Sequence, residues 1–198
     1  MNRYADILLA LLLAVFTVQA QAGIVIGGTR IIYNGDKKEA SASIRNPDRS
    51  GVWLVQSWVD SGMKGSKTPF IVTPPLFRIN PGEENILRIV RTGGSLPEDR
   101  ESVFWLNVKS IPATDDSVPH DNVLQVVVKS RLKLFYRPAG LEGLPETAYH
   151  HLSVSRSGNR LTVSNPTSYY VTLFTLKVDG QEIKEADMVP PKGSVSFT

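Results

Sequence analysis

Apolar and polar residues alternate along most of this chain, whereas the 3.6-residue period of an amphipathic helix is almost absent. Segments 52–59, 86–90 and 103–108 have the pattern of strands, and turn sequences rich in Asn, Asp, Gly and Pro separate them. Many short strands at nearly regular spacing are typical of antiparallel sandwiches of the immunoglobulin type. We therefore predict an all-β fold.

One predicted strand is much longer than the others. Residues 122–136 run without Pro or Gly, whereas strands usually have about 5–6 residues. The sequence Arg137-Pro138-Ala139-Gly140 then breaks the pattern, so we predict a first domain over 23–138 and a second over 139–198. A sandwich domain usually needs about 100 residues. The second segment is much shorter and stops within an alternating stretch, so we expect an incomplete domain.

Residues 1–22 are predicted to be a signal peptide rather than part of the fold. Arg3 precedes an apolar run over 7–18, which is shorter than the roughly 20 residues of a membrane-spanning helix. Ala20 and Ala22 place small side chains at the two positions that a signal peptidase reads. We predict cleavage after Ala22, export of the chain and no stable membrane insertion.

Composition excludes several classes of function. The chain has no Cys, which excludes disulfides, thiolate nucleophiles and iron–sulfur clusters. Of its three His residues, His150 and His151 are expected in a strand, where adjacent side chains point to opposite faces and cannot easily share a metal ion. The net charge of +3 is a weak signal for nucleic acid. We find no catalytic motif and expect no enzyme activity, metal or cofactor.

Several short motifs occur in an order that resembles one protein family. They are Thr73-Pro74-Pro75, Asn80-Pro81-Gly82, Asp99-Arg100-Glu101-Ser102, Asn122-Val123-Leu124-Gln125, Lys133-Leu134-Phe135-Tyr136-Arg137-Pro138, Asn165-Pro166-Thr167 and Tyr169-Tyr170-Val171-Thr172. Together they closely resemble the periplasmic pilus, or fimbrial, assembly chaperones of PapD type. The run from Lys133 to Pro138 is the most specific of them, and the resemblance extends from about Gly23 to the last residue.

The resemblance implies a fold and a function. It implies two immunoglobulin-like β-sandwich domains at an angle, in a periplasmic chaperone that binds pilin subunits and delivers them to an outer-membrane usher for fimbria assembly. Pilins lack their final strand, and donation of a chaperone strand to them is an established property of this family rather than a deduction from these residues.

The resemblance also implies roles for particular residues. In the long predicted strand, Leu124, Val126 and Val128 would fill the pilin groove, because only every second side chain of a strand faces one side. Arg30 and Lys133 match the cation pair that binds the C-terminal carboxylate of the subunit. Arginine can bind a carboxylate with two parallel hydrogen bonds, and lysine adds a compact charge.

A further ion network is expected between the domains. Glu101 and Arg88 match two members of this network. Its other acidic member would come from beyond residue 198, so we expect the network to be broken. The remaining Glu101–Arg88 ion pair would then contribute little to stability. The moderate length of the loop between Val108 and Asn122, and the absence of Cys, resemble the short-loop branch of the family.

Two other interpretations stay open at this point. The chain could be a secreted β-sandwich module that serves adhesion or binding, or a non-functional, truncated remnant of a chaperone. The sequence does not identify the pilin subunit or the pilus system. It also leaves open whether the free protein covers its apolar edge by forming a dimer.

Overall fold

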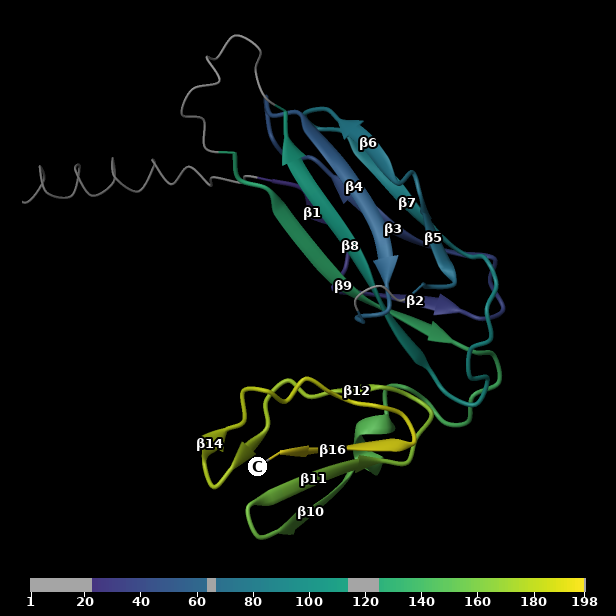
Figure 1. Ribbon diagram of the computed structural model, residues 1–198, viewed down its shortest axis with the longest axis vertical. Coiled ribbons are helices and arrows are strands. Elements are labelled where there is room, and N and C mark those ends of the chain that lie inside the picture. Colours follow the sequence, from purple (N-terminus) through teal and green to yellow (C-terminus); the bar gives the residue numbers. More distant parts are fainter. Residues whose placement is uncertain (1–22, 64–66, 114–124, 198) are drawn as a thin grey trace, which may run out of the picture.

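The computed structural model describes residues 23–63, 67–113 and 125–197, which form two groups of strands along the chain (Figure 1). The strands up to Arg137 build two facing sheets, and those from Ser153 onward build a smaller group. The helical structure in the described part is one 3-10 turn, η1 (Ala148–His151). No helix in those ranges is long and apolar enough to cross a membrane. The all-β prediction is confirmed.

The first group is a sandwich of a four-stranded and a five-stranded sheet. The four-stranded sheet has the order β1 (Val25–Ile26), β3 (Glu39–Arg45), β7 (Glu84–Arg91), β5 (Phe70–Thr73). The five-stranded sheet has the order β2 (Arg30–Asn34), β9 (Val128–Arg137), β8 (Ser102–Pro112), β4 (Trp53–Asp60), β6 (Leu76–Ile79). All neighbours are antiparallel except β2 and β9, which run parallel.

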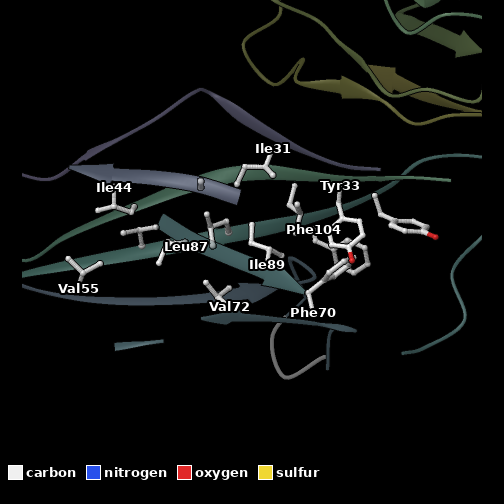
Figure 2. Packing of buried hydrophobic residues seen from close by; sticks show 14 of the residues in the cluster. Ile31, Tyr33, Ile44, Val55, Phe70, Val72, Leu87, Ile89 and Phe104 are labelled. Carbon is white, nitrogen blue, oxygen red and sulfur yellow. The ribbon is translucent and has the colours of Figure 1, made fainter. Parts of the chain in front are cut away.

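The core lies between these two sheets and follows the period of two. Ile44 and Leu87 from one sheet and Val55 from the other are fully buried, and Figure 2 shows these side chains pointing into the same layer. Phe70 contacts Phe104 edge-to-face at the end of this layer, with ring centroids 4.9 Å apart. Segment 52–59 lies almost entirely within β4, where Leu54 and Gln56 face solvent because only one face of the sheet packs on the core.

The second group contains three small sheets. They are formed by β10 (Ser153–Ser157), β11 (Arg160–Asn165) and β16 (Gly193–Phe197); by β12 (Val171–Thr172) and β15 (Met188–Val189); and by β13 (Lys177–Val178) and β14 (Gln181–Glu182). In Figure 1, β12 lies on the side of this group that faces the first one. Val163 and Val189 are buried here.

The expected strand position of His150 and His151 is wrong. Both lie in η1, where the Ala148 amide donates to the Pro145 carbonyl and the His150 amide to the Thr147 carbonyl. Strand β10 begins only at Ser153. The turn forms because Pro145 has a φ suited to helical turns and the Thr147 hydroxyl donates to the Leu144 carbonyl at 3.2 Å.

Candidate functional site

Strand β9 is paired differently on its two sides. On one side, residues from Val128 to Tyr136 pair with β8. On the other side, the parallel partner β2 pairs only with residues from Lys133 to Arg137. Within the described residues, the first half of β9 therefore has an unpaired backbone edge, to which another strand could add hydrogen bonds. In Figure 1, β9 runs along the first group toward the second.

The apolar alternation of β9 continues from the core into solvent. Leu132 and Leu134 are 8% and 0% exposed and belong to the interior of the sandwich. Val128, in line with them, is 47% exposed, and Val126 is 61% exposed. Leu124 lies outside the described residues. The Gln125 side chain donates to the Pro112 carbonyl at 2.8 Å, which holds the segment before β9 beside the end of β8.

The two predicted cations lie next to each other. Arg30 begins β2 and is the register partner of Lys133 in β9, so both side chains leave the same face of the sheet. Neighbouring strands are about 4.8 Å apart, which brings the two within reach of one carboxylate. Arg30 is exposed, whereas the Lys133 side chain is only 18% exposed and its ammonium forms an ion pair with Asp187 of the second group.

Aromatic side chains support the cations on this face of the sheet. The Arg131 guanidinium lies 4.2 Å and the Lys133 ammonium 5.8 Å from the ring centroid of Trp105. Lys129 lies 5.1 Å from the centre of Trp58. Cations are attracted to the faces of aromatic rings, so this packing fixes several otherwise adaptable side chains. The result is a row of basic side chains on β9 that packs on aromatic rings of β8 and β4.

Glu101 connects the two groups of strands. It is 4% exposed, and its carboxylate accepts hydrogen bonds from Arg137 Nε at 2.7 Å and from the Tyr170 amide at 2.8 Å. Its own amide donates to the Ser168 carbonyl at 2.9 Å. A carboxylate can be buried at acceptable cost when charge-assisted hydrogen bonds satisfy it, as here.

The expected pair between Glu101 and Arg88 is wrong. Arg88 lies on β7 in the other sheet, with its side chain 66% exposed and 3.9 Å from Glu39. Arg137 takes its place because Tyr136 is in register with Ser102, which brings the next residue of β9 beside Glu101. The network was also expected to be broken, but Glu101 reaches the second group through backbone groups.

Three further contacts were not predicted. Arg137 could have been found from the sequence, because antiparallel pairing of 102–112 with the long strand places it beside Glu101. The pairs Lys192–Asp99, at 2.9 Å, and Lys133–Asp187 join residues that are 93 and 54 positions apart in the sequence. No local pattern signals such pairs.

Comparison with known proteins identifies the family. The model for the N-terminal domain of PapD, a pili and flagellar-assembly chaperone, matches residues 23–142, and the model for the PapD C-terminal domain matches residues 147–198. The chain belongs to the PapD-type pilus assembly chaperones. It has two domains of the all-β type that the sequence predicted, and it is not an enzyme.

Relatives cover nearly the whole of this chaperone. It is 48% identical over 191 residues to the probable fimbrial chaperone LpfB of Escherichia coli O157:H7, covering 96% of this chain and 82% of the relative. It is 45% identical over 178 residues to the chaperone FimC of Escherichia coli K12, covering 88% and 73%. These matches decide in favour of a fimbrial chaperone over an adhesion module.

Solved structures agree with this assignment. The Escherichia coli chaperone DraB superposes with a TM-score of 0.78 at 40% identity, covering 88% of this chain and 85% of DraB. The SafB chaperone of Salmonella enterica, solved in complex with the SafA pilin, gives a TM-score of 0.79 at 35% identity and covers 90% and 85%. The periplasm is the working compartment of the family, and this chaperone is assigned to it.

Proposed function

We propose that this chaperone binds a pilin subunit along the open edge of β9, completes its fold by donor-strand complementation and delivers it to an outer-membrane usher. The observation that carries the proposal is the change in burial and pairing along β9. Its apolar side chains are buried at Leu132 and Leu134 and exposed at Val128, next to an unpaired backbone edge, and Val126 just before the strand is exposed as well. SafB, which was solved in complex with the SafA pilin, supports a pilin as the partner.

The open edge of β9 and the exposed valines at and just before its start can supply what a pilin subunit without its final strand lacks. A subunit that lacks a strand exposes an apolar groove and unpaired backbone groups, both of which favour aggregation. An added strand supplies the missing hydrogen bonds, and alternate side chains fill the groove. We assign the filling to Leu124, Val126 and Val128, so that one strand serves the chaperone core at one end and the subunit at the other.

Arg30 and Lys133 are proposed to bind the C-terminal carboxylate of the subunit. Their side chains share one row of the sheet, and Lys133 already binds a carboxylate, that of Asp187. Fixing the end of the subunit chain sets the register of the added strand, and a shift by one residue would turn every side chain away from its pocket. Removing either cation should weaken subunit binding by about 2–5 kcal/mol if the subunit carboxylate stays desolvated in the complex.

Export and domain limits complete the proposal. Residues 1–22 are assigned as a signal peptide that is removed after Ala22, and the two domains are assigned to 23–138 and 139–198. In the periplasm, the subunit would leave β9 when the N-terminal extension of another subunit replaces the donated strand at the usher.

Co-expression with candidate pilins tests the proposal. Wild-type chaperone should co-purify with its subunit, and a synthetic N-terminal extension peptide should release it. Arg30→Ala and Lys133→Ala should recover much less subunit. Arg45→Ala and Lys177→Ala are matched controls, since both side chains are exposed on strands away from β9. Equal recovery by all five proteins would exclude the assigned carboxylate site.

A further inference from the structure

Lys133 is already paired across the junction between the domains. Its ammonium donates a hydrogen bond to Oδ1 of Asp187, which comes from the second domain. The two partners differ in their surroundings: the Lys133 side chain is 18% exposed and that of Asp187 is 61% exposed. Most of the Lys133 side chain is thus covered, while the Asp187 side chain lies largely in solvent.

The backbone of Asp187 is fixed, whereas its side chain is not. The Asp187 carbonyl accepts a hydrogen bond from the Leu173 amide at 2.8 Å, and the next residue, Met188, pairs with Thr172 of β12. The only hydrogen bond of the Asp187 carboxylate to the described residues is the one from Lys133. This carboxylate can therefore rotate into water without disturbing the strand that follows it.

The approach to Lys133 is restricted. The face of Trp105 lies 5.8 Å from its ammonium, and β2 and β8 flank β9 at this residue. Because Asp187 already pairs with the ammonium and little of the Lys133 side chain is exposed, a second carboxylate that binds this ammonium would meet Asp187 there. Two carboxylates at one ammonium repel each other, so the two acids compete rather than share.

We propose that Asp187 is a built-in competitor that occupies Lys133 in the free chaperone and leaves it when the C-terminal carboxylate of a subunit binds. This inference rests on the carboxylate site proposed above. It assigns to Asp187 the role of an intramolecular substitute for the subunit terminus. Asp187 neutralises the charge of Lys133 while no subunit is bound. Water can hydrate its exposed carboxylate once it leaves, so replacement by the subunit carboxylate costs little free energy.

A peptide carrying a free C-terminus tests the competition directly. The probe is a fluorescein-labelled hexapeptide, Ser-Thr-Val-Thr-Val-Ser, prepared with a free carboxylate and as the C-terminal amide. Asp187→Asn keeps the shape of the side chain and removes its charge. We expect it to bind the carboxylate form about two- to fivefold more tightly than wild type, as release of an exposed ion pair allows. Binding of the amide form should not change.

Asp179→Asn is the matched control, because it removes the same charge from the second domain at a side chain that is 80% exposed and paired with Arg156. It should bind both peptides as wild type does. Asp187→Ala serves as a second variant, and the urea midpoint of each protein shows that it is folded. Equal or weaker binding of the carboxylate peptide by both Asp187 variants would overturn the competition.

Lys133→Ala separates this outcome from failure of the carboxylate site itself. If wild type prefers the carboxylate form and Lys133→Ala does not, the site exists, and an unchanged Asp187→Asn affinity refutes the competitor alone. If no variant distinguishes the two peptides, the carboxylate site and its competitor are both refuted. Pilin co-purification would then still report on strand donation.

Discussion

At the scale of single residues, Asp60 shows how the basic face of the first domain is kept in place. Its carboxylate accepts hydrogen bonds from the Gly62 amide at 2.8 Å, Asn107 Nδ2 at 2.7 Å and Arg131 Nη2 at 2.9 Å. Burial acts to raise the pKa of Asp60, but these three donors together hold that pKa below its usual value. Gly62 has a φ of +82°, a conformation that glycine adopts without strain.

The lowered pKa of Asp60 predicts a pH dependence of stability. A group whose pKa is lower in the folded state stabilises the fold above its unfolded value, about pH 4, and this contribution disappears as the pH falls through the folded value. Asp60→Asn should therefore cost about 0.5–1.5 kcal/mol of unfolding free energy at pH 7, and less at pH 3. Urea unfolding at several pH values measures the difference.

The control for this experiment is Asp36→Asn, which changes a side chain that is 56% exposed and whose ion pair within the described residues is with its neighbour Lys37. Its stability should follow that of wild type at every pH. A gap between Asp60→Asn and wild type that stays constant from pH 7 to pH 3 would contradict the assigned role of the charge.

Also at this scale, two asparagines show what a sequence pattern can and cannot reveal. Asn46 and Asn165 lie in the kind of turn sequence expected from the chain, and the side-chain oxygen of each accepts the backbone amide two residues later, at 3.1 Å and 3.0 Å. Both are also almost fully buried, and their amide groups bind carbonyls of distant segments. The turn is local and could be predicted, whereas the burial depends on segments far away in the sequence.

At the scale of elements, β9 changes its role along its length. Its second half has strands on both sides and contributes to the core, while its first half begins with the exposed Val128 and has an open edge. Substitutions should therefore have different effects on stability and on binding at the two ends.

The double variant Val126→Ser, Val128→Ser tests the open half. Because the Val126 and Val128 side chains are 61% and 47% exposed, we expect the unfolding free energy to change by less than about 0.5 kcal/mol. Recovery of co-expressed pilin should fall strongly, since the subunit groove loses two apolar side chains. Val154→Ser is the matched control, with an exposed fraction of 61% on β10. A double variant that recovers pilin as well as Val154→Ser does would argue against groove filling.

Strand prediction from the sequence succeeded where alternation decides the outcome. Segments 86–90 and 103–108 lie within β7 and β8, and Leu132 and Leu134 share one face as expected. The period of two indicates which face a side chain occupies, but not which strand lies beside it. The pair of Arg88 with Glu101 was expected from the family resemblance, and it is wrong because Arg88 lies on the opposite sheet. The actual partner, Arg137, was missed.

At the scale of the whole molecule, a few contacts join the two domains. Glu101 binds Arg137 and the backbone of the second domain, and the rings of Phe135 and Tyr170 lie 5.5 Å apart beside it. The exposed ion pair of Lys192 and Asp99 contributes little to the free energy that holds the domains together, because solvent screens the two charges. Glu101 is thus the main polar connection between the domains in the described part of the chain.

Glu101→Gln should loosen this connection. We expect the unfolding free energy to fall by about 1–3 kcal/mol, because the charge-assisted bond to a partly exposed arginine is lost while the shape of the side chain is kept. Small-angle X-ray scattering should detect a wider distribution of domain arrangements. Glu39→Gln, which removes an exposed partner of Arg88, is the control. Identical stability and scattering of the two variants would show that Glu101 does not fix the junction.

The parallel pairing of β2 with β9 has a consequence for the length of the guest. The pairing places the Arg30–Lys133 row five residues after Val128, a separation of about 17 Å along an extended strand. A polypeptide held at both points must span that interval with a fixed number of residues. This chaperone would therefore measure the distance between the terminus of its guest and the first vacant pocket, and would reject a tail that is one residue too long or too short.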